Sequence, residues 1–66
     1  MEETKLLSYI GLECEVILKR PLWGRTAFYG VLQRTPDGAY TLIDNRFGGE
    51  IRFTAASVES IQILKS

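Results

Sequence analysis

The residues of this chain with the clearest chemical potential are arginines interspersed with aromatic side chains. Arg20, Trp23 and Arg25 fall within one short segment, and Arg46 precedes Phe47 directly. Aromatic rings stack on the bases of single-stranded RNA, while guanidinium groups bind its phosphates. The pattern predicts an RNA-binding surface formed by Arg20, Trp23, Arg25, Arg46, Phe47 and Arg52.

Charge alone leaves a second interpretation open, in which these arginines are ordinary solvated surface. The 66 residues carry 8 basic and 8 acidic side chains, so the total gives no argument for nucleic acid. Residues 1–18 nevertheless hold four acidic residues against one basic, and residues 19–52 hold six basic against three acidic. Trp23 also has two interpretations: a lid over one end of the fold, or an exposed binding anchor.

Catalytic and metal chemistry lack the residues they need. The chain has no histidine and one cysteine, which excludes a Ser-His pair and the usual zinc or haem ligand sets. Glu13 and Glu15 alternate on a predicted strand and face water, where neither carboxyl is held in an acid-base pocket. Cys14 is expected on the core side of that strand as an inert thiol. We therefore expect a non-enzymatic protein with no catalytic residue, cofactor or metal.

The cysteine count and the short apolar segments also predict the cellular location. A single cysteine and the lack of an apolar leader favour a reducing cytoplasm. The apolar pair Leu6-Leu7 is far too short to cross a membrane. We expect a cytoplasmic protein without a membrane partner.

The elements that position these residues centre on the segment from Phe28 to Asp44, which reads as two strands joined by a turn. Thr35-Pro36-Asp37-Gly38 has the residues that a short hairpin loop requires. Gly30 lies in the middle of the first strand, where a glycine marks a sharp bend or a close approach of another backbone. A strand bent at its centre is typical of a small barrel.

The remaining segments complete one all-β domain over residues 1–66. Thr4 is expected to cap a short helix, and Thr54 a single helical turn before the last strand. Alternating apolar residues predict five short antiparallel strands that close into a strongly bent, partly open barrel. The expected bounds are a helix at 4–10 and strands at 12–19, 26–34, 39–44, 50–53 and 58–64.

An open barrel leaves strand edges with unpaired backbone groups, which invite another strand. The last strand has no proline to protect it and carries apolar residues on both sides. We expect a homo-oligomer formed by edge pairing, with an interface at Ile61, Gln62, Ile63 and Leu64. The alternative is a protein-interaction module of the ribosome-assembly or scaffold type with no nucleic-acid role.

Several short motifs resemble those of a known family. The run Cys-Glu-Val-Ile-Leu-Lys at 14–19, Tyr29-Gly30-Val31-Leu32, the turn at Asp37 and Glu50-Ile51-Arg52-Phe53 resemble the SH3-like, Sm-like small barrels, which include the RNA chaperone Hfq. Residues 18–25, leading into Phe28-Tyr29-Gly30-Val31-Leu32, are similar to the C-terminal domain of ribosome maturation factor RimP.

The resemblance implies an Sm-like fold, assembly into a ring and an RNA or ribosomal-protein partner. It also adds Asp37 to the RNA-binding residues, because an Asp in this turn belongs to the Sm motif. Where the Sm motifs continue with Asn and with Gly, this chain has Gly38-Ala39 and Phe53.

Overall fold

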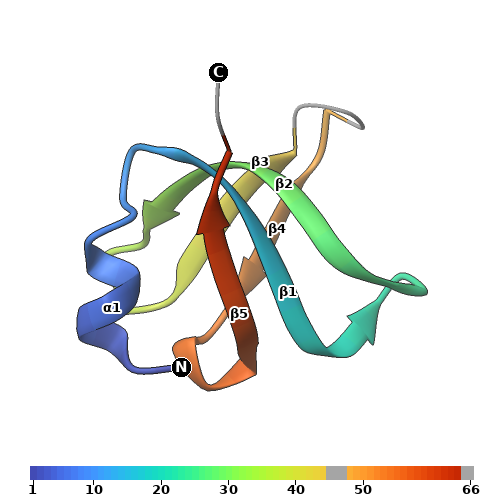
Figure 1. Ribbon diagram of the computed structural model, residues 1–66, viewed down its shortest axis with the longest axis horizontal. Coiled ribbons are helices and arrows are strands. Elements are labelled where there is room, and N and C mark those ends of the chain that lie inside the picture. Colours follow the sequence, from blue (N-terminus) through green and yellow to red (C-terminus); the bar gives the residue numbers. More distant parts are fainter. Residues whose placement is uncertain (45–47, 65–66) are drawn as a thin grey trace.

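The protein folds as one antiparallel sheet preceded by a short helix (Figure 1). The computed structural model describes residues 1–44 and 48–64. The strands run in the order β4-β3-β2-β1-β5, which leaves β4 and β5 at the two edges. The predicted all-β class with five antiparallel strands is confirmed. The elements are α1 Glu3–Leu7, β1 Glu13–Leu22, β2 Arg25–Arg34, β3 Tyr40–Asp44, β4 Glu50–Phe53, the 3-10 helix η1 Ala55–Ser57 and β5 Val58–Ile63.

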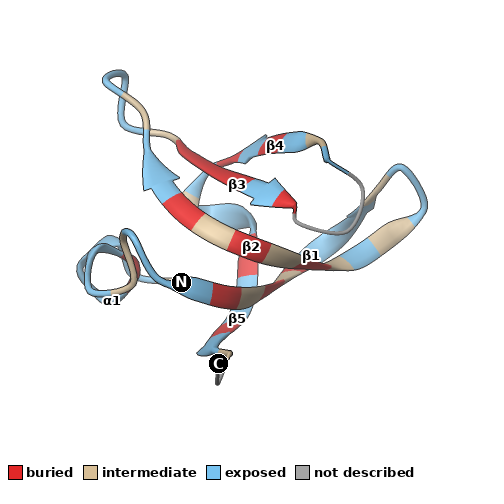
Figure 2. Cartoon of the chain, turned by 90° about the horizontal axis from the view of Figure 1, so that it is seen from above, coloured by how far each residue is buried: buried red, intermediate tan, exposed pale blue. Residues whose placement is uncertain are grey.

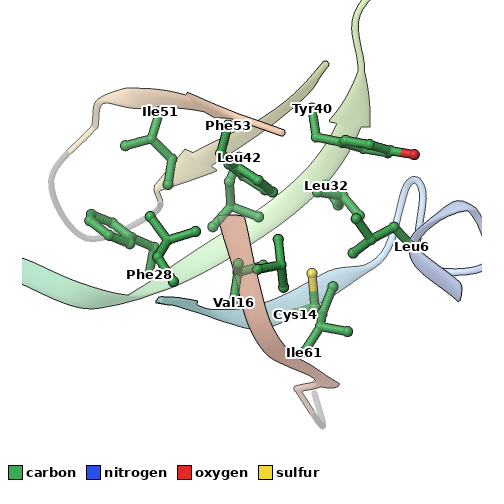
Figure 3. Close-up of a cluster of buried hydrophobic side chains, with 12 residues drawn as sticks. Leu6, Cys14, Val16, Phe28, Leu32, Tyr40, Leu42, Ile51, Phe53 and Ile61 are labelled. Carbon is green, nitrogen blue, oxygen red and sulfur yellow. The ribbon is translucent and has the colours of Figure 1, made fainter. Parts of the chain in front are cut away.

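The sheet curls around a single apolar core (Figures 2 and 3). On β1 the side chains alternate strictly, so that Cys14, Val16 and Leu18 are buried between exposed or half-buried neighbours. Each apolar side chain removed from water in this way stabilises the fold by roughly 1.5–3 kcal/mol. The other buried apolar residues are Leu6, Phe28, Leu32, Tyr40, Leu42, Ile51, Phe53, Val58 and Ile61.

Gly30 is the position at which the backbones of β2 and β3 leave no room for a side chain. It pairs with Cys14 on one side and Asp44 on the other. A Cβ atom built on Gly30 would lie 1.8 Å from the carbonyl oxygen of Ile43 and 2.6 Å from its carbonyl carbon. The backbone of β3 therefore occupies the space that a side chain at residue 30 would need, and the predicted close approach at this glycine is confirmed.

The β2–β3 connection forms the predicted turn. Gly38 has a φ of +88° and donates a hydrogen bond to the carbonyl oxygen of Thr35 at 3.1 Å. The amide of Thr35 in turn donates to Ala39 at 2.9 Å. This closed turn fixes the register in which Arg34 faces Tyr40.

The N-terminal helix is shorter than predicted and is capped differently. It ends at Leu7 because the following residues join the sheet: Gly11 donates to the carbonyl of Leu32, and the amide of Leu32 donates to Leu12. Glu2 holds the N-cap position, so the prediction that Thr4 caps the helix was wrong. Of the predicted inward residues, Leu6 is fully buried whereas Leu7 is 41% exposed.

Two strands differ from the alternating pattern expected of them. Leu12 precedes β1 and is exposed rather than in the core. On β5 the pairing shifts between Ser60 and Val58, so one extra residue bulges there and the burial follows a spacing of three, with Val58 and Ile61 inside. A β-bulge of this kind resets which side chains face the core.

The remaining differences are at strand ends. β1 extends to Leu22 through Pro21, which is tolerated because the pairing of β1 with β5 ends at Leu18. β2 begins one residue earlier than predicted, β3 one residue later, and β5 ends one residue earlier. Thr54 precedes η1 as expected, but its hydroxyl contacts that of Ser57 at 3.1 Å and makes no capping bond.

The close approach at Gly30 makes a direct prediction. Gly30→Ala should lower the free energy of unfolding by about 1–3 kcal/mol or more, because the new methyl group forces the backbones of β2 and β3 apart. Gly49→Ala is the matched control, since a Cβ there meets no atom within 4 Å and the backbone is not in the left-handed region. Urea unfolding of both variants measures the effect, and equal stability of the two would contradict this account of the bend.

Candidate functional site

The tip of the β1–β2 hairpin carries the first predicted aromatic residue. Leu22 pairs with Arg25, so Trp23 and Gly24 form a two-residue loop. Both loop residues have positive φ, +54° and +76°, as a type I′ turn requires. The Trp23 side chain is 74% exposed. Trp23 therefore does not act as a lid over the core, and of the two interpretations the exposed anchor remains.

Arg25 is held in place by three interactions. Its guanidinium lies 4.7 Å from the centre of the Phe28 ring and donates to the carbonyl oxygen of Ala27 at 3.0 Å. It also lies 3.7 Å from the carboxylate of Asp44, which is only 3% exposed. A cation over an aromatic face contributes about 0.5–2 kcal/mol, depending on how far it is removed from water. Arg25 is thus fixed on β2 while 34% of its side chain stays exposed.

Trp23 and Arg25 border a hollow of about 220 Å³, which we call the aromatic hollow. The buried rings and chains of Phe28 and Ile51 form its floor, and Asp44 and Gly49 complete the lining among the described residues.

A second, larger hollow of about 490 Å³ is lined in part by the last residues of β1, and we call it the cationic hollow. Lys19 and Arg20 of β1 and Arg52 of β4 line it, and all three side chains are exposed. Within residues 1–44 and 48–64 no acidic side chain lines it, and neither Lys19 nor Arg20 forms an ion pair. The remaining lining is Leu18, Pro21, Leu22, Phe53, Ala56 and Ser57.

Asp37 and Arg52 are brought into contact by the β2–β3 turn. The Arg52 guanidinium forms an ion pair with the Asp37 carboxylate, which also accepts a hydrogen bond from the Thr35 hydroxyl. The Thr35 bond, with help from the Ala39 amide and the Arg52 charge, lowers the pKa of Asp37 below its usual value. The pair orients Arg52 at the rim of the cationic hollow.

The predicted RNA-binding residues thus fall into two groups, one at each hollow. Arg20 and Arg52 share the cationic hollow, with Asp37 paired to Arg52, whereas Trp23 and Arg25 share the aromatic hollow. Arg46 and Phe47 lie outside the described residues.

The predicted interface residues on β5, and Leu64 directly after it, are in different environments. Ile61 is 8% exposed and belongs to the core, and Gln62 donates to the Glu15 carboxylate at 2.9 Å. Ile63 is 55% exposed, while Leu64 is half-buried and its amide donates to Glu13 at 3.0 Å. Among the described strands β5 pairs only with β1, so its outer edge stays open.

Sequence reasoning missed most of the residues that line the hollows, among them Lys19, Phe28, Asp44 and Ile51. Lys19 precedes Arg20 on β1, and that adjacency of two cations was the available signal. Phe28 and Ile51 are buried core residues, but a buried residue can still line a surface hollow. Asp44 ends the apolar segment of β3, where a buried acid facing a basic residue could have been suspected.

Other reactive chemistry is confined to Cys14, which is fully buried. Burial raises the pKa of its thiol to about 11. No group of three or more cysteine, aspartate or glutamate residues within the described parts of the chain is arranged to hold a metal ion. In the same residues, no helix has the length and apolar character needed to span a membrane.

The buried thiol gives a pH-dependent prediction. The unfolded chain loses the Cys14 proton near pH 9 and the folded chain near pH 11, so the folded state binds more protons between these values. The contribution of Cys14 to stability is therefore complete below pH 9 and is lost as the pH rises to 11. Denaturation of wild-type and Cys14→Val protein from pH 7 to 11 isolates this effect, because other groups titrate in both. If the stability difference between the two proteins stays constant over that window, this account fails.

Comparisons with protein families, with curated proteins and with solved structures found no match for this chain.

Proposed function

We propose that this protein is a non-enzymatic, Sm-like barrel that self-assembles and binds single-stranded RNA weakly through the cationic hollow. The observation that carries the proposal is the convergence of Lys19 and Arg20 from β1 with Arg52 from β4 around one hollow. Arg52 is far from Lys19 and Arg20 in sequence, and the fold brings it to the same hollow.

The charge at this hollow suits a phosphate backbone. Lysine and arginine side chains bind phosphate, arginine by paired N–H donors in one plane. Arg52 is held by Asp37, so its orientation is set before any ligand arrives. Three cations and one acid give a local charge of +2, which is small for a nucleic-acid site. Affinity from phosphate contacts alone is therefore weak and falls with salt.

The two open sheet edges support self-assembly. β4 and β5 lie at opposite ends of the strand order, so an edge of one copy can pair with the other edge of the next copy. Such head-to-tail pairing generates a ring when the rotation closes. A ring repeats each cationic hollow around one axis, and linked weak sites gain affinity by effective concentration.

The resemblance to Sm-like barrels is consistent with this proposal. Asp37 occupies the turn position of the first Sm motif, and Arg52 the arginine position of the second. In the fold these two side chains form an ion pair. The proposal therefore gives Asp37 a positioning role for Arg52 and gives Arg52 the contact with RNA.

A protein-interaction module without RNA is the alternative function. Exposed apolar side chains favour it: Leu7 and Leu12 are each 41% exposed, and Ile63 is 55% exposed. In this version the open edges bind another protein chain and the cationic hollow is ordinary surface.

RNA binding is tested by reversing one charge in the cationic hollow. Fluorescence anisotropy with a labelled U-rich or A-rich oligonucleotide should show binding. The logarithm of the association constant should fall with the logarithm of the salt concentration at a slope of about −1.4 to −2.1, which corresponds to two or three phosphate contacts. Arg20→Glu should weaken binding at least tenfold and flatten the slope. Lys5→Glu on α1 changes the total charge equally and should leave binding nearly unchanged. Affinity that is insensitive to salt, or equal losses in both variants, would reject the hollow as the RNA site.

Self-assembly is tested at the open edge of β5. Wild-type protein at tens of micromolar should sediment as an oligomer, and Ile63→Glu should sediment as a monomer because it places a charge beside the pairing edge. Leu7→Glu, an equivalent change on α1, should keep the oligomer. A monomeric wild type, or an Ile63→Glu variant of unchanged mass, contradicts edge pairing.

A further inference from the structure

We propose that the aromatic hollow is a stacking subsite for one base of the RNA strand whose phosphates lie at the cationic hollow. The inference rests on the proposed function: the phosphates of the RNA lie at the cationic hollow, and one of its bases lies at the aromatic hollow. Its ligand class is a planar nucleobase of single-stranded RNA, bound through its face and not through its edges.

The first argument comes from the conformation of Trp23. A bulky residue with positive φ costs about 1–3 kcal/mol, and the first position of a type I′ turn favours Asn, Asp or Gly. Trp23 adopts this conformation at φ +54° and still leaves 74% of its surface in water. Neither local conformation nor burial therefore favours a tryptophan here. A ring held out at a rigid hairpin tip is well placed to stack on a ligand.

The second argument is the size and lining of the hollow. At about 220 Å³ it is smaller than the 300–1,000 Å³ typical of sites that enclose a whole small molecule, so it suits one ring system. Trp23 offers a π-face, and Arg25, itself stacked on Phe28, offers a guanidinium plane. Both groups stack on bases.

The lining also indicates how selective the site is. Asp44 is 3% exposed and already interacts with Arg25, so it is not presented to a base edge. Among the described residues the lining is mainly apolar apart from the Arg25 guanidinium, so binding depends more on stacking area than on the identity of the base. We therefore expect purines, with their larger rings, to bind somewhat more tightly than pyrimidines.

The third argument decides between a base and the aromatic side chain of a protein partner. The hairpin connects the two hollows along the chain, because Leu22 lines one and the next residue, Trp23, lines the other. From Lys19 to Tyr29 the sequence has Lys19, Arg20 and Arg25 and no acidic residue. A ligand that combines a flat ring with nearby negative charge fits both hollows, and a nucleotide chain has this chemistry at every residue.

Trp23 fluorescence tests the subsite directly, since Trp23 is the chain's single tryptophan. Titration with oligoadenylate and oligouridylate of eight nucleotides should quench it, with adenylate binding more tightly. Inorganic polyphosphate, which has charge and no base, should bind without comparable quenching. RNA that binds by anisotropy but leaves the fluorescence unchanged overturns the subsite and leaves the proposed function intact, whereas no RNA binding overturns both.

Two variants separate stacking from folding. Trp23→Asn creates an Asn-Gly type I′ turn, so it should raise the thermal unfolding midpoint while weakening RNA binding about 5- to 150-fold, the range for one stacked base. Trp23→Phe keeps a ring and should recover most of the affinity. Unchanged RNA affinity in Trp23→Asn rejects the subsite. Quenching by N-acetylphenylalaninamide but not by RNA also rejects it, and indicates a protein partner instead.

Discussion

The fold depends on one steric constraint, the contact between the backbones of β2 and β3 at Gly30. The carbonyl group of Ile43 lies where any side chain at residue 30 would have to be. This approach lets β3 and β4 turn over the core, so that Leu42 and Ile51 meet Val16 from the opposite side (Figure 3). A flat sheet of these five strands would expose one apolar face, and a chain of 66 residues has no second layer to cover it.

The same curl produces the two hollows. Because β1 pairs with β5 only as far as Leu18, its last residues continue past the sheet edge and carry Lys19, Arg20 and the hairpin tip outward. β4, brought round by the bend, places Arg52 and Phe53 opposite them. The Asp37–Arg52 pair ties the β2–β3 turn to β4 at this position. The proposed RNA surface is therefore a consequence of how the sheet ends, with no dedicated element added to build it.

The sequence was sufficient for the elements whose signals are local. Strict alternation predicted the buried side of β1, and the Thr35–Gly38 turn and the crowding at Gly30 were predicted from residue type alone. Features set by pairing between distant segments were not predictable. The bulge near Glu59 changes which residues of β5 face the core. Backbone hydrogen bonds of Gly11 and Leu12 with Leu32 hold the chain after α1 against β2. The division of the arginines between two hollows depends likewise on where the pairing of β1 with β5 stops.

The structural features that cost stability lie together at the parts of the surface proposed to bind. The tip holds a tryptophan in a backbone conformation suited to asparagine. Among the described strands β4 and β5 have open edges, and Ile63 leaves most of its side chain in water. A domain of this size has only a few kcal/mol of net stability, so each such feature is a large fraction of the total. In the core, by contrast, the apolar side chains of β1 and β4 alternate as the sequence predicts and pack into one buried cluster. Residues that go against local conformational preference or stay unburied are expected at positions where binding, and not folding, determines which residue is favourable. Pairing with a neighbouring strand would supply backbone hydrogen bonds at the sheet edges, and a stacked base would cover the exposed ring of Trp23. Assembly and RNA binding would therefore both stabilise the parts of the surface that cost the single chain stability.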